Sequence, residues 1–206
     1  MFEAFQKEFL PDEIENRVLA EAELASVDDR LDQLFALFGG ISFNQGLYRI
    51  ISVEDGPRWE QRVSAAFPNF AAKVTCFGID WLGRVFALDR TRQVDGAPGV
   101  VLLEPGTGEV LEIPCDIATF HEVELIQYSE EALAKSFYKQ WRSQGGAAPR
   151  INQCVGYRRP LFLGGTDTTD NLELSDLEVY WEIMGQLLEK TRGLPVGTPV
   201  QQINIS

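Results

Sequence analysis

The apolar positions near the start of the chain follow a helical period. Apolar side chains recur at i, i+3, i+4 and i+7, a spacing that places them on one face of a helix. They are Leu31, Leu34, Phe35 and Phe38. Asp28 or Asp29 is suited to cap this helix, and Gly39-Gly40 ends it. The first forty residues are therefore expected to be mostly helical.

The pattern then changes to that of β-strands. A strand is predicted over Gly46–Ser52, and a short helix with Pro in its first turn follows over Pro57–Phe67. Two strands joined by a turn are predicted over Lys73–Asp89. A clearer hairpin spans Val100–Pro114, where two β-rich arms flank a Pro-Gly-Thr-Gly turn. The polar residues 90–99 between these pairs are expected to form a loop.

Helical periodicity returns in the C-terminal part. Two helices are predicted over residues 117–125 and 131–146, and a third over residues 176–188. Ser175 and Glu178 have the spacing of a capping box at the start of this last helix. Its apolar, aromatic-rich face is more typical of a packed core than of a ligand site.

This order of elements predicts an α+β fold. N-terminal helices precede a mainly antiparallel sheet, and a mostly helical C-terminal part follows it. A chain of 206 residues with 45% hydrophobic residues can bury one core or two small ones. We expect a helix–sheet domain over residues 1–114, a mostly helical domain over residues 115–192, and a tail over residues 193–206.

Composition narrows the classes of function. The chain has 31 acids against 18 bases, a net charge of −13. Because nucleic-acid binding needs a basic footprint, this balance argues against direct binding of DNA or RNA. No apolar stretch long enough to span a membrane occurs, and the acidic, amphipathic N-terminus lacks the features of a signal peptide. A cytoplasmic protein is expected.

Few residues point to catalysis. The three cysteines, Cys76, Cys115 and Cys154, are far apart and form no CxxC, so we expect buried free thiols and neither disulfides nor a zinc site. For the single histidine, His121, a packing or capping role is favoured over general-base work. A His121–Cys154 pair, or an acid pair such as Asp80 with Asp89, stays open. Without a recognisable catalytic set, the sequence predicts no enzyme, cofactor or metal.

The loop Gly164–Asn171 is the main alternative site. Its Gly pair permits a turn with positive φ, and Arg158 and Arg159 lie just upstream. These features allow a phosphate or small-ligand site, although the acids that follow the Gly pair would repel an anion. Asp167 and Asp170 could instead contribute to a cation site, but the segment does not fit the EF-hand pattern.

Charge is the most distinctive feature of the C-terminal part. Between Arg159 and Lys190 the chain carries acids and no base. With the aromatic face of the last helix buried, these acids are expected to form a continuous acidic surface. This surface is either a solvated helix face or a docking site for a basic partner. The candidate partner-binding residues are Asp167, Asp170, Glu173, Asp176, Glu178 and Glu182.

Several longer motifs resemble a known family. They are CFGIDWLGRVFALD (Cys76–Asp89), LLEPGTGEVLEIP (Leu102–Pro114), FHEVEL (Phe120–Leu125), FYKQW (Phe137–Trp141) and CVGYRRPLFLGGTDTTDNLELSDLEVYWEIMGQL (Cys154–Leu187). In this order they resemble the bacterial GAD-like family with a Tdi-type C-terminal domain, which includes immunity proteins for type VI secreted DNase toxins. The resemblance implies a non-enzymatic antitoxin that binds a basic nuclease toxin in the cytoplasm. It implies no contact residues, because the shared motifs look structural.

Three hypotheses follow from the sequence. The first is an immunity protein that neutralises a secreted nuclease by binding it. The second is an enzyme or small-ligand-binding protein that uses the Gly164–Asn171 loop with Arg158 or Arg159. The third is a protein-interaction module without a toxin partner.

Overall fold

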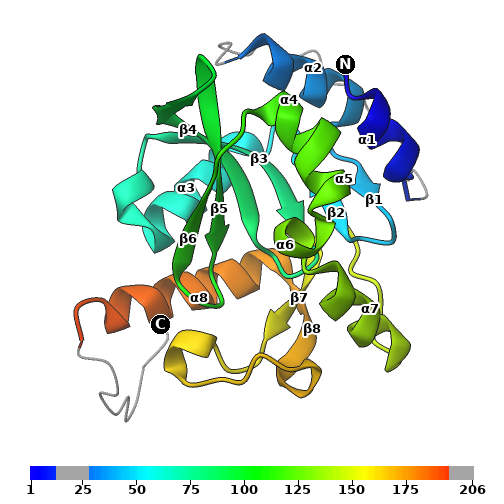
Figure 1. The fold of residues 1–206 in the computed structure, drawn as a ribbon. Coiled ribbons are helices and arrows are strands. Elements are labelled where there is room, and N and C mark those ends of the chain that lie inside the picture. Colours follow the sequence, from blue (N-terminus) through cyan, green and yellow to red (C-terminus); the bar gives the residue numbers. More distant parts are fainter. Residues whose placement is uncertain (13–27, 195–206) are drawn as a thin grey trace.

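The chain folds around one six-stranded antiparallel sheet, seen in a computed structural model that describes residues 1–12 and 28–194. The strand order β1-β2-β3-β4-β5-β6 follows the sequence, so neighbouring strands are joined by hairpin connections or short excursions (Figure 1). The strands are β1 (Ser42–Phe43), β2 (Tyr48–Ile50), β3 (Val74–Asp80), β4 (Val85–Val94), β5 (Ala97–Glu104) and β6 (Glu109–Ile113). A separate antiparallel pair is formed by β7 (Gln153–Tyr157) and β8 (Leu172–Asp176).

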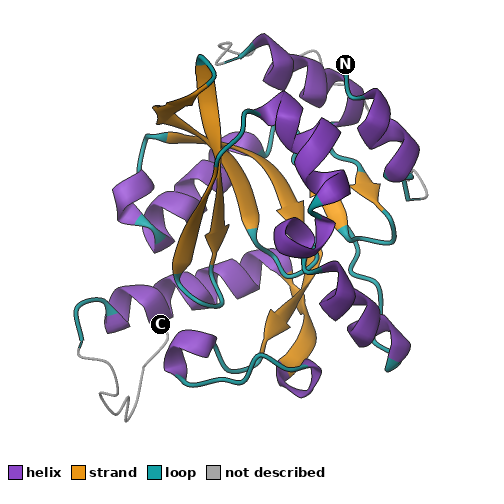
Figure 2. Ribbon diagram, viewed as in Figure 1, coloured by secondary structure: helices purple, strands orange, loops and turns teal. Residues whose placement is uncertain are grey.

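Helices surround this sheet (Figure 2). The α-helices are α1 (Glu3–Glu8), α2 (Asp29–Phe38), α3 (Gly56–Ala66), α4 (Ile117–Thr119), α5 (Leu125–Gln127), α6 (Ser129–Leu133), α7 (Lys135–Ser143) and α8 (Leu177–Thr191). The short 3-10 and π turns are η1 (Pro68–Phe70), η2 (Phe120–Glu124), η3 (Leu161–Leu163) and η4 (Thr169–Asn171). The α+β fold class predicted from the sequence is confirmed.

Both faces of the central strands are buried. Along β4, Phe86 and Leu88 join a hydrophobic cluster with the N-terminal helices and the segment after β6, whereas Val85 and Ala87 join a second cluster with α3 and α8. Successive strand residues point to opposite faces of a sheet, so this alternation assigns one cluster to each face. The long apolar run in this strand is the sequence signature of burial on both sides.

Both clusters combine residues from before and after residue 114. Phe77 of the sheet packs with Phe120, and Trp59 of α3 packs with Trp181 of α8. The division into domains at residues 1–114 and 115–192 stays a prediction. The expected tail lies almost wholly outside the described residues, as does the helical expectation for residues 13–27.

Several predicted elements are confirmed. The helix with the apolar stripe is α2, and Asp28 caps it by accepting a hydrogen bond from the Arg30 N–H. The helix predicted from Pro57 is α3, and the strand pairs predicted on either side of residues 90–99 are β3–β4 and β5–β6.

The expectation of a loop over residues 90–99 is wrong. Strand β4 continues to Val94 and β5 begins at Ala97, so the two form one long hairpin. Asp95 and Gly96 both have positive φ, as a two-residue primed turn requires. The Asp-Gly pair was the available signal, but the polar residues around it masked the strand pattern.

The single helix predicted over residues 131–146 is broken in two. Ala134 adopts the left-handed conformation, with φ 48°, between α6 and α7. The last carbonyls of α6 are bound from the turn between β3 and β4: Trp81 Nε1–H donates to the Leu133 carbonyl and Arg84 Nη2–H to the Ala132 carbonyl. These tertiary hydrogen bonds compensate for the interrupted helical ladder, which local periodicity cannot reveal.

The segment before α8 contains a strand pair that was not predicted from the sequence. Its two ends pair as β7 and β8, from Gln153 opposite Asp176 to Tyr157 opposite Leu172. Strand β8 has only five residues, and its apolar–polar alternation covers just the first four of them. Such a short run gives a weak strand signal in the sequence.

Candidate interaction surface

The six candidate acids lie on η4, β8, the first half of α8 and the loop leading to them. All except Glu178 are exposed, and Glu178 itself is half-exposed. The structure therefore places these acids at the surface, as the sequence predicts. They differ in what they already bind within the chain, and that difference separates structural acids from acids open to a partner.

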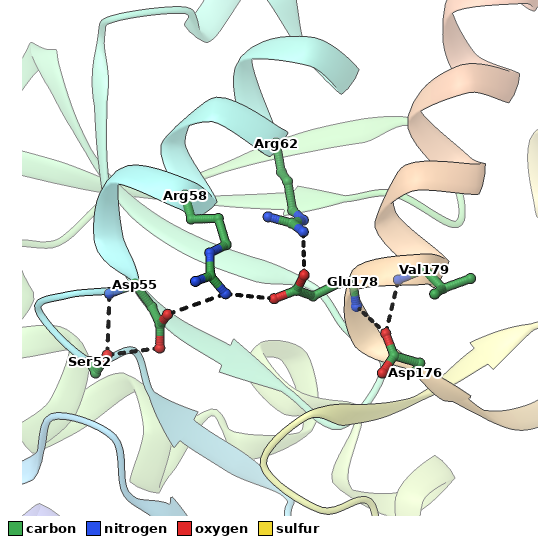
Figure 3. Close-up of polar contacts among 7 residues, drawn as sticks. All are labelled: Ser52, Asp55, Arg58, Arg62, Asp176, Glu178 and Val179. Carbon is green, nitrogen blue, oxygen red and sulfur yellow. Dashed lines mark hydrogen bonds and ion pairs between the residues drawn. The ribbon is translucent and has the colours of Figure 1, made fainter.

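Glu178 is held by two arginines from another helix (Figure 3). Arg58 Nη1 lies 2.9 Å from Glu178 Oε1, and Arg62 Nη2 lies 2.5 Å from Glu178 Oε2. Arg58 also lies 3.6 Å from Asp55 at the start of α3. These contacts tie the start of α8 to α3 at the edge of the Trp59–Trp181 packing. Glu178 is therefore engaged within the protein.

Asp176 caps α8. Its Oδ1 accepts hydrogen bonds from the backbone N–H groups of Glu178 and Val179, each at 3.0 Å. The predicted capping box is wrong in its residues, because Ser175 belongs to β8 and the Glu178 side chain turns to α3 (Figure 3). An aspartate at the cap satisfies the free N–H groups of the first turn and adds a favourable interaction with the helix dipole.

Asp167 and Glu173 are also engaged, more weakly. Tyr157 Oη–H donates to Asp167 Oδ1 at 2.7 Å. This hydrogen bond and burial raise the pKa of the Tyr157 phenol, with burial as the larger cause. Glu173 lies 3.5 Å from Arg158, and both side chains are more than half exposed, so this pair contributes little to stability.

Asp170 and Glu182 are the most available of the six. Asp170 is exposed on η4 and forms no ion pair among the described residues. Glu182 is exposed on α8 and accepts a hydrogen bond from Gln186 on the next turn. A basic partner could approach both carboxylates without breaking a contact between elements of the fold. We refer to these two acids and Glu173, whose ion pair with Arg158 is exposed, as the available acidic surface.

Nothing in the sequence identified Arg58 and Arg62 as partners of the acidic segment. Their spacing of four residues places them on one face of α3, and Arg62 also lies 5.6 Å from the centre of the Trp59 ring. Which acid they would meet depends on how α3 packs on α8. That packing is a tertiary feature with no local signal.

The Gly164–Asn171 loop is fixed by its own hydrogen bonds. The N–H groups of Gly164 and Gly165 donate to the carbonyls of Leu161 and Pro160. Asn171 accepts from the Arg159 N–H and donates to the carbonyls of Arg159 and Thr166. The backbone donors that a phosphate would need at this Gly pair are thus already used.

The glycines of this loop have structural reasons to be glycine. Gly164 has φ +77°, a conformation that other residues rarely adopt. A Cβ on Gly165 would lie 2.0 Å from the Arg159 carbonyl oxygen, a distance no real structure tolerates. The Gly pair is therefore explained by chain geometry.

The candidate catalytic pairs are not brought together. His121 is fully buried, with Nε2 3.1 Å from the Tyr48 hydroxyl and Nδ1 2.8 Å from the Ile117 carbonyl oxygen, so its bonds go to these groups and not to Cys154. Burial lowers the pKa of His121 to about 4. The packing role favoured for this residue fits these contacts.

The proposed acid pair is also separated. Asp80 pairs in register with Tyr48 at one end of β3, whereas Asp89 pairs with Val74 at the other end. Asp89 accepts hydrogen bonds from the N–H and hydroxyl of Thr91. The two carboxylates therefore cannot act together on one substrate.

The three cysteines are free and buried. Burial raises the pKa of each thiol, to about 12 for Cys115. Within residues 1–12 and 28–194, no group of three or more His, Cys, Asp or Glu side chains is placed to hold a metal ion. No helix in the same ranges has the length and apolar character needed to cross a membrane.

The turn between β3 and β4, residues 80–84, positions the elements that carry the acidic surface. Its groups bond to α6, β7 and α8. The bonds are Trp81 Nε1–H to the Leu133 carbonyl, the Val155 N–H to the Trp81 carbonyl, and Trp181 Nε1–H to the Gly83 carbonyl. The DWLGR motif thus has the structural role that the sequence predicts for it.

Comparisons with known proteins support the resemblance seen in the sequence. Residues 120–188 match the family model described as T6SS immunity protein Tdi1, C-terminal. The resemblance to a Tdi-type C-terminal domain is thereby confirmed for this segment, which contains all six candidate acids. No curated protein matches the chain.

A solved structure shows that the fold extends beyond the matched segment. The crystal structure of Atu4351 from Agrobacterium tumefaciens is similar to this chain with a TM-score of 0.64 and 17% sequence identity. The match covers 90% of this chain and 89% of that chain. At this identity the likeness establishes a shared fold over nearly the full length.

Proposed function

We propose that this protein is an immunity protein of a type VI secretion system, which binds a nuclease toxin and neutralises it without catalysis. The observation that carries the proposal is the available acidic surface formed by Asp170, Glu173 and Glu182. It lies inside the segment that matches the immunity-protein family model. The toxin would be met in the cytoplasm, where a nuclease reaches its substrate.

The physical argument rests on charge complementarity. A nuclease must present a basic surface to the phosphate backbone of DNA. An inhibitor with an exposed acidic surface can be captured rapidly by that surface and can compete with DNA for it. The available acids serve this purpose, because they do not hold the fold together.

Co-expression with any nuclease encoded beside this protein's own gene tests the proposal. Cell survival and recovery of a one-to-one complex are the expected results. If the cells die and no complex is recovered, the proposal is wrong.

Charge-reversal variants then locate the interface. Asp170→Lys with Glu182→Lys is expected to slow association with the toxin about tenfold or more, because long-range attraction sets the rate of encounter. The matched control is Glu54→Lys with Glu109→Lys, which makes the same charge change at two exposed acids elsewhere. Equal slowing in both variants would show that net charge matters and that this surface is not the interface.

Asp176 and Glu178 are unsuitable for this test, although they belong to the acidic segment. Reversing Asp176 removes the cap of α8, and reversing Glu178 places three cations together with Arg58 and Arg62. Loss of binding in either variant would report a disturbed helix as readily as a lost contact.

A further inference from the structure

A second charged surface lies next to the acidic one and has the opposite sign. From residue 132 to residue 166 the chain contains bases and no acid, although acids outnumber bases 31 to 18 in the whole chain. The bases are Lys135, Lys139, Arg142, Arg150, Arg158 and Arg159. This separation of charge is not what an evenly solvated acidic protein would show.

Three of these bases share one face of α7. Lys135, Lys139 and Arg142 stand at i, i+4 and i+7, which aligns them along the helix. Arg150, which is exposed, follows in the segment after the helix. We call these four residues the basic face.

The rotation of α7 is fixed by the contacts of Tyr138 and Trp141. The Tyr138 hydroxyl donates to the Gln45 carbonyl, and the Tyr138 ring packs against Trp81 at a centroid distance of 5.0 Å. Trp141 Nε1–H donates to the Ala147 carbonyl. The basic face is therefore held in place before any partner arrives.

The basic face has no carboxylate partner among the described residues. Elsewhere several arginines are paired: Arg30 binds Asp28 and Asp116, Arg62 binds Glu178, and Arg84 binds Asp80. None of the four residues of the basic face forms such a pair within the part of the chain that the structure describes, and Arg142 Nη1 is buried there without a hydrogen-bond partner. The four cations of the basic face therefore form no ion pair among the described residues, although acids are in excess in the chain.

We propose that the basic face binds an acidic segment of the protein partner. On the partner, this segment would lie beside the basic surface that contacts the available acidic surface of this protein. This inference rests on the proposed function and adds a second point of contact to it. Nucleases that use metal ions carry carboxylates near a basic groove, so their surfaces present both signs close together. The turn η4, which carries Asp170, packs against α7, and the two charged surfaces of this protein therefore adjoin.

Two adjoining surfaces of opposite sign fix the orientation of a partner. A single acidic surface attracts any basic protein, whereas a pair also repels partners whose charges are reversed in position. Nucleic acid is the less favoured occupant, because four cations on a protein of net charge −13 give a weak footprint for a polyanion.

The test uses the full-length protein with Lys139→Glu and Arg150→Glu. Both side chains are exposed, and the control, Lys73→Glu with Lys190→Glu, makes the same charge change at two other exposed lysines. With the co-expressed nuclease, the first pair is expected to weaken binding about tenfold relative to the control. Equal affinities would overturn the proposal while leaving the immunity function standing.

A second measurement decides the matter even if no nuclease binds. Backbone amide shifts are recorded while a short polyglutamate peptide, or a DNA duplex of equal charge, is added to the wild type. Shifts over α7 and residues 147–152 with the peptide alone, lost in Lys139→Glu/Arg150→Glu, are expected. Shifts with DNA alone, or no shifts at α7, would overturn the proposal.

Discussion

Carboxylate groups have different roles in two regions of this protein. One region is the buried ion pair Asp80–Arg84, and the other is the group of surface acids around α8. Asp80 is fully buried, and its carboxylate accepts from the N–H groups of Leu82 and Arg84 and from Arg84 Nε at 2.7 Å. Asp170 and Glu182, in contrast, are exposed and bridge no elements of the fold. The buried pair fixes the conformation of the turn between β3 and β4, whereas the exposed acids leave negative charge free to interact with a partner.

This difference shows where substitutions should separate folding from binding. A buried carboxylate whose partner groups cannot reach water is costly to remove, because those groups are left without compensation. An exposed carboxylate loses little by substitution, because water replaces its interactions. The structural effects should therefore decrease from the turn at residues 80–84 outward to α8.

Removing the carboxylate of Asp80 is expected to have the largest effect. Asp80→Ala leaves Arg84 buried and unpaired, which should lower the free energy of unfolding by about 3–5 kcal/mol. Urea unfolding followed by circular dichroism measures this change. Replacing both charges, as Asp80→Ala with Arg84→Met, should restore part of the loss, and a double variant no more stable than the single one would contradict the argument.

The single histidine gives a pH-dependent effect of slightly smaller size. The pKa of His121 is lowered by burial to about 4, so between pH 6.5 and 4 the unfolded chain binds a proton that the folded chain does not. Stability should fall as the pH is lowered through this window, by roughly 3 kcal/mol in total, and should be regained above pH 6.5.

The difference between wild type and His121→Asn isolates this contribution from the carboxylates. Burial raises the pKa values of Asp80 and Glu104, so these groups change stability in the opposite direction as the pH falls. As the pH falls from 6.5 to 4, the wild type should lose stability relative to the variant. Parallel curves would mean that His121 binds a proton equally well in the folded and unfolded chains.

Capping of α8 provides an effect of about 1 kcal/mol. Asp176→Ala removes the acceptor for two backbone N–H groups and should lower the free energy of unfolding by that amount. Ser175→Ala is the matched control and should change it by only a few tenths, because Ser175 is in β8 and does not cap the helix. If Ser175→Ala were the more destabilising substitution, the result would support the capping box expected from the sequence and contradict capping by Asp176.

How much could be predicted from the sequence follows from which features are local. Periodicity and caps identified α2, α3 and the hairpin β5–β6, because each depends on residues close in sequence. The break at Ala134 depends on hydrogen bonds from Trp81 and Arg84, which are distant in sequence. The strands β7 and β8 each depend on pairing with the other across an intervening loop. Such contacts leave no periodic trace.

The same distinction applies to the candidate site. The run of acids was visible in the sequence, and the structure places those acids at the surface. Their division into engaged and available residues was not visible, because Arg58 and Arg62 reach Glu178 across the packing of two helices. The basic face also required the structure, since only the contacts of α7 show its bases to be unpaired.

The smallest expected effect concerns Glu178 itself. Its ion pairs with Arg58 and Arg62 are partly exposed, with 46% of the Glu178 side chain accessible, so Glu178→Gln should cost no more than about 1 kcal/mol. High salt should reduce this cost, because screening weakens exposed pairs. Glu182→Gln is the control on the same helix and should be close to neutral. Thermal unfolding at low and high salt measures the stability of both variants. If the loss of stability in Glu178→Gln were the same at both salt concentrations, the Glu178 ion pairs would behave as a buried pair like Asp80–Arg84 and not as exposed pairs.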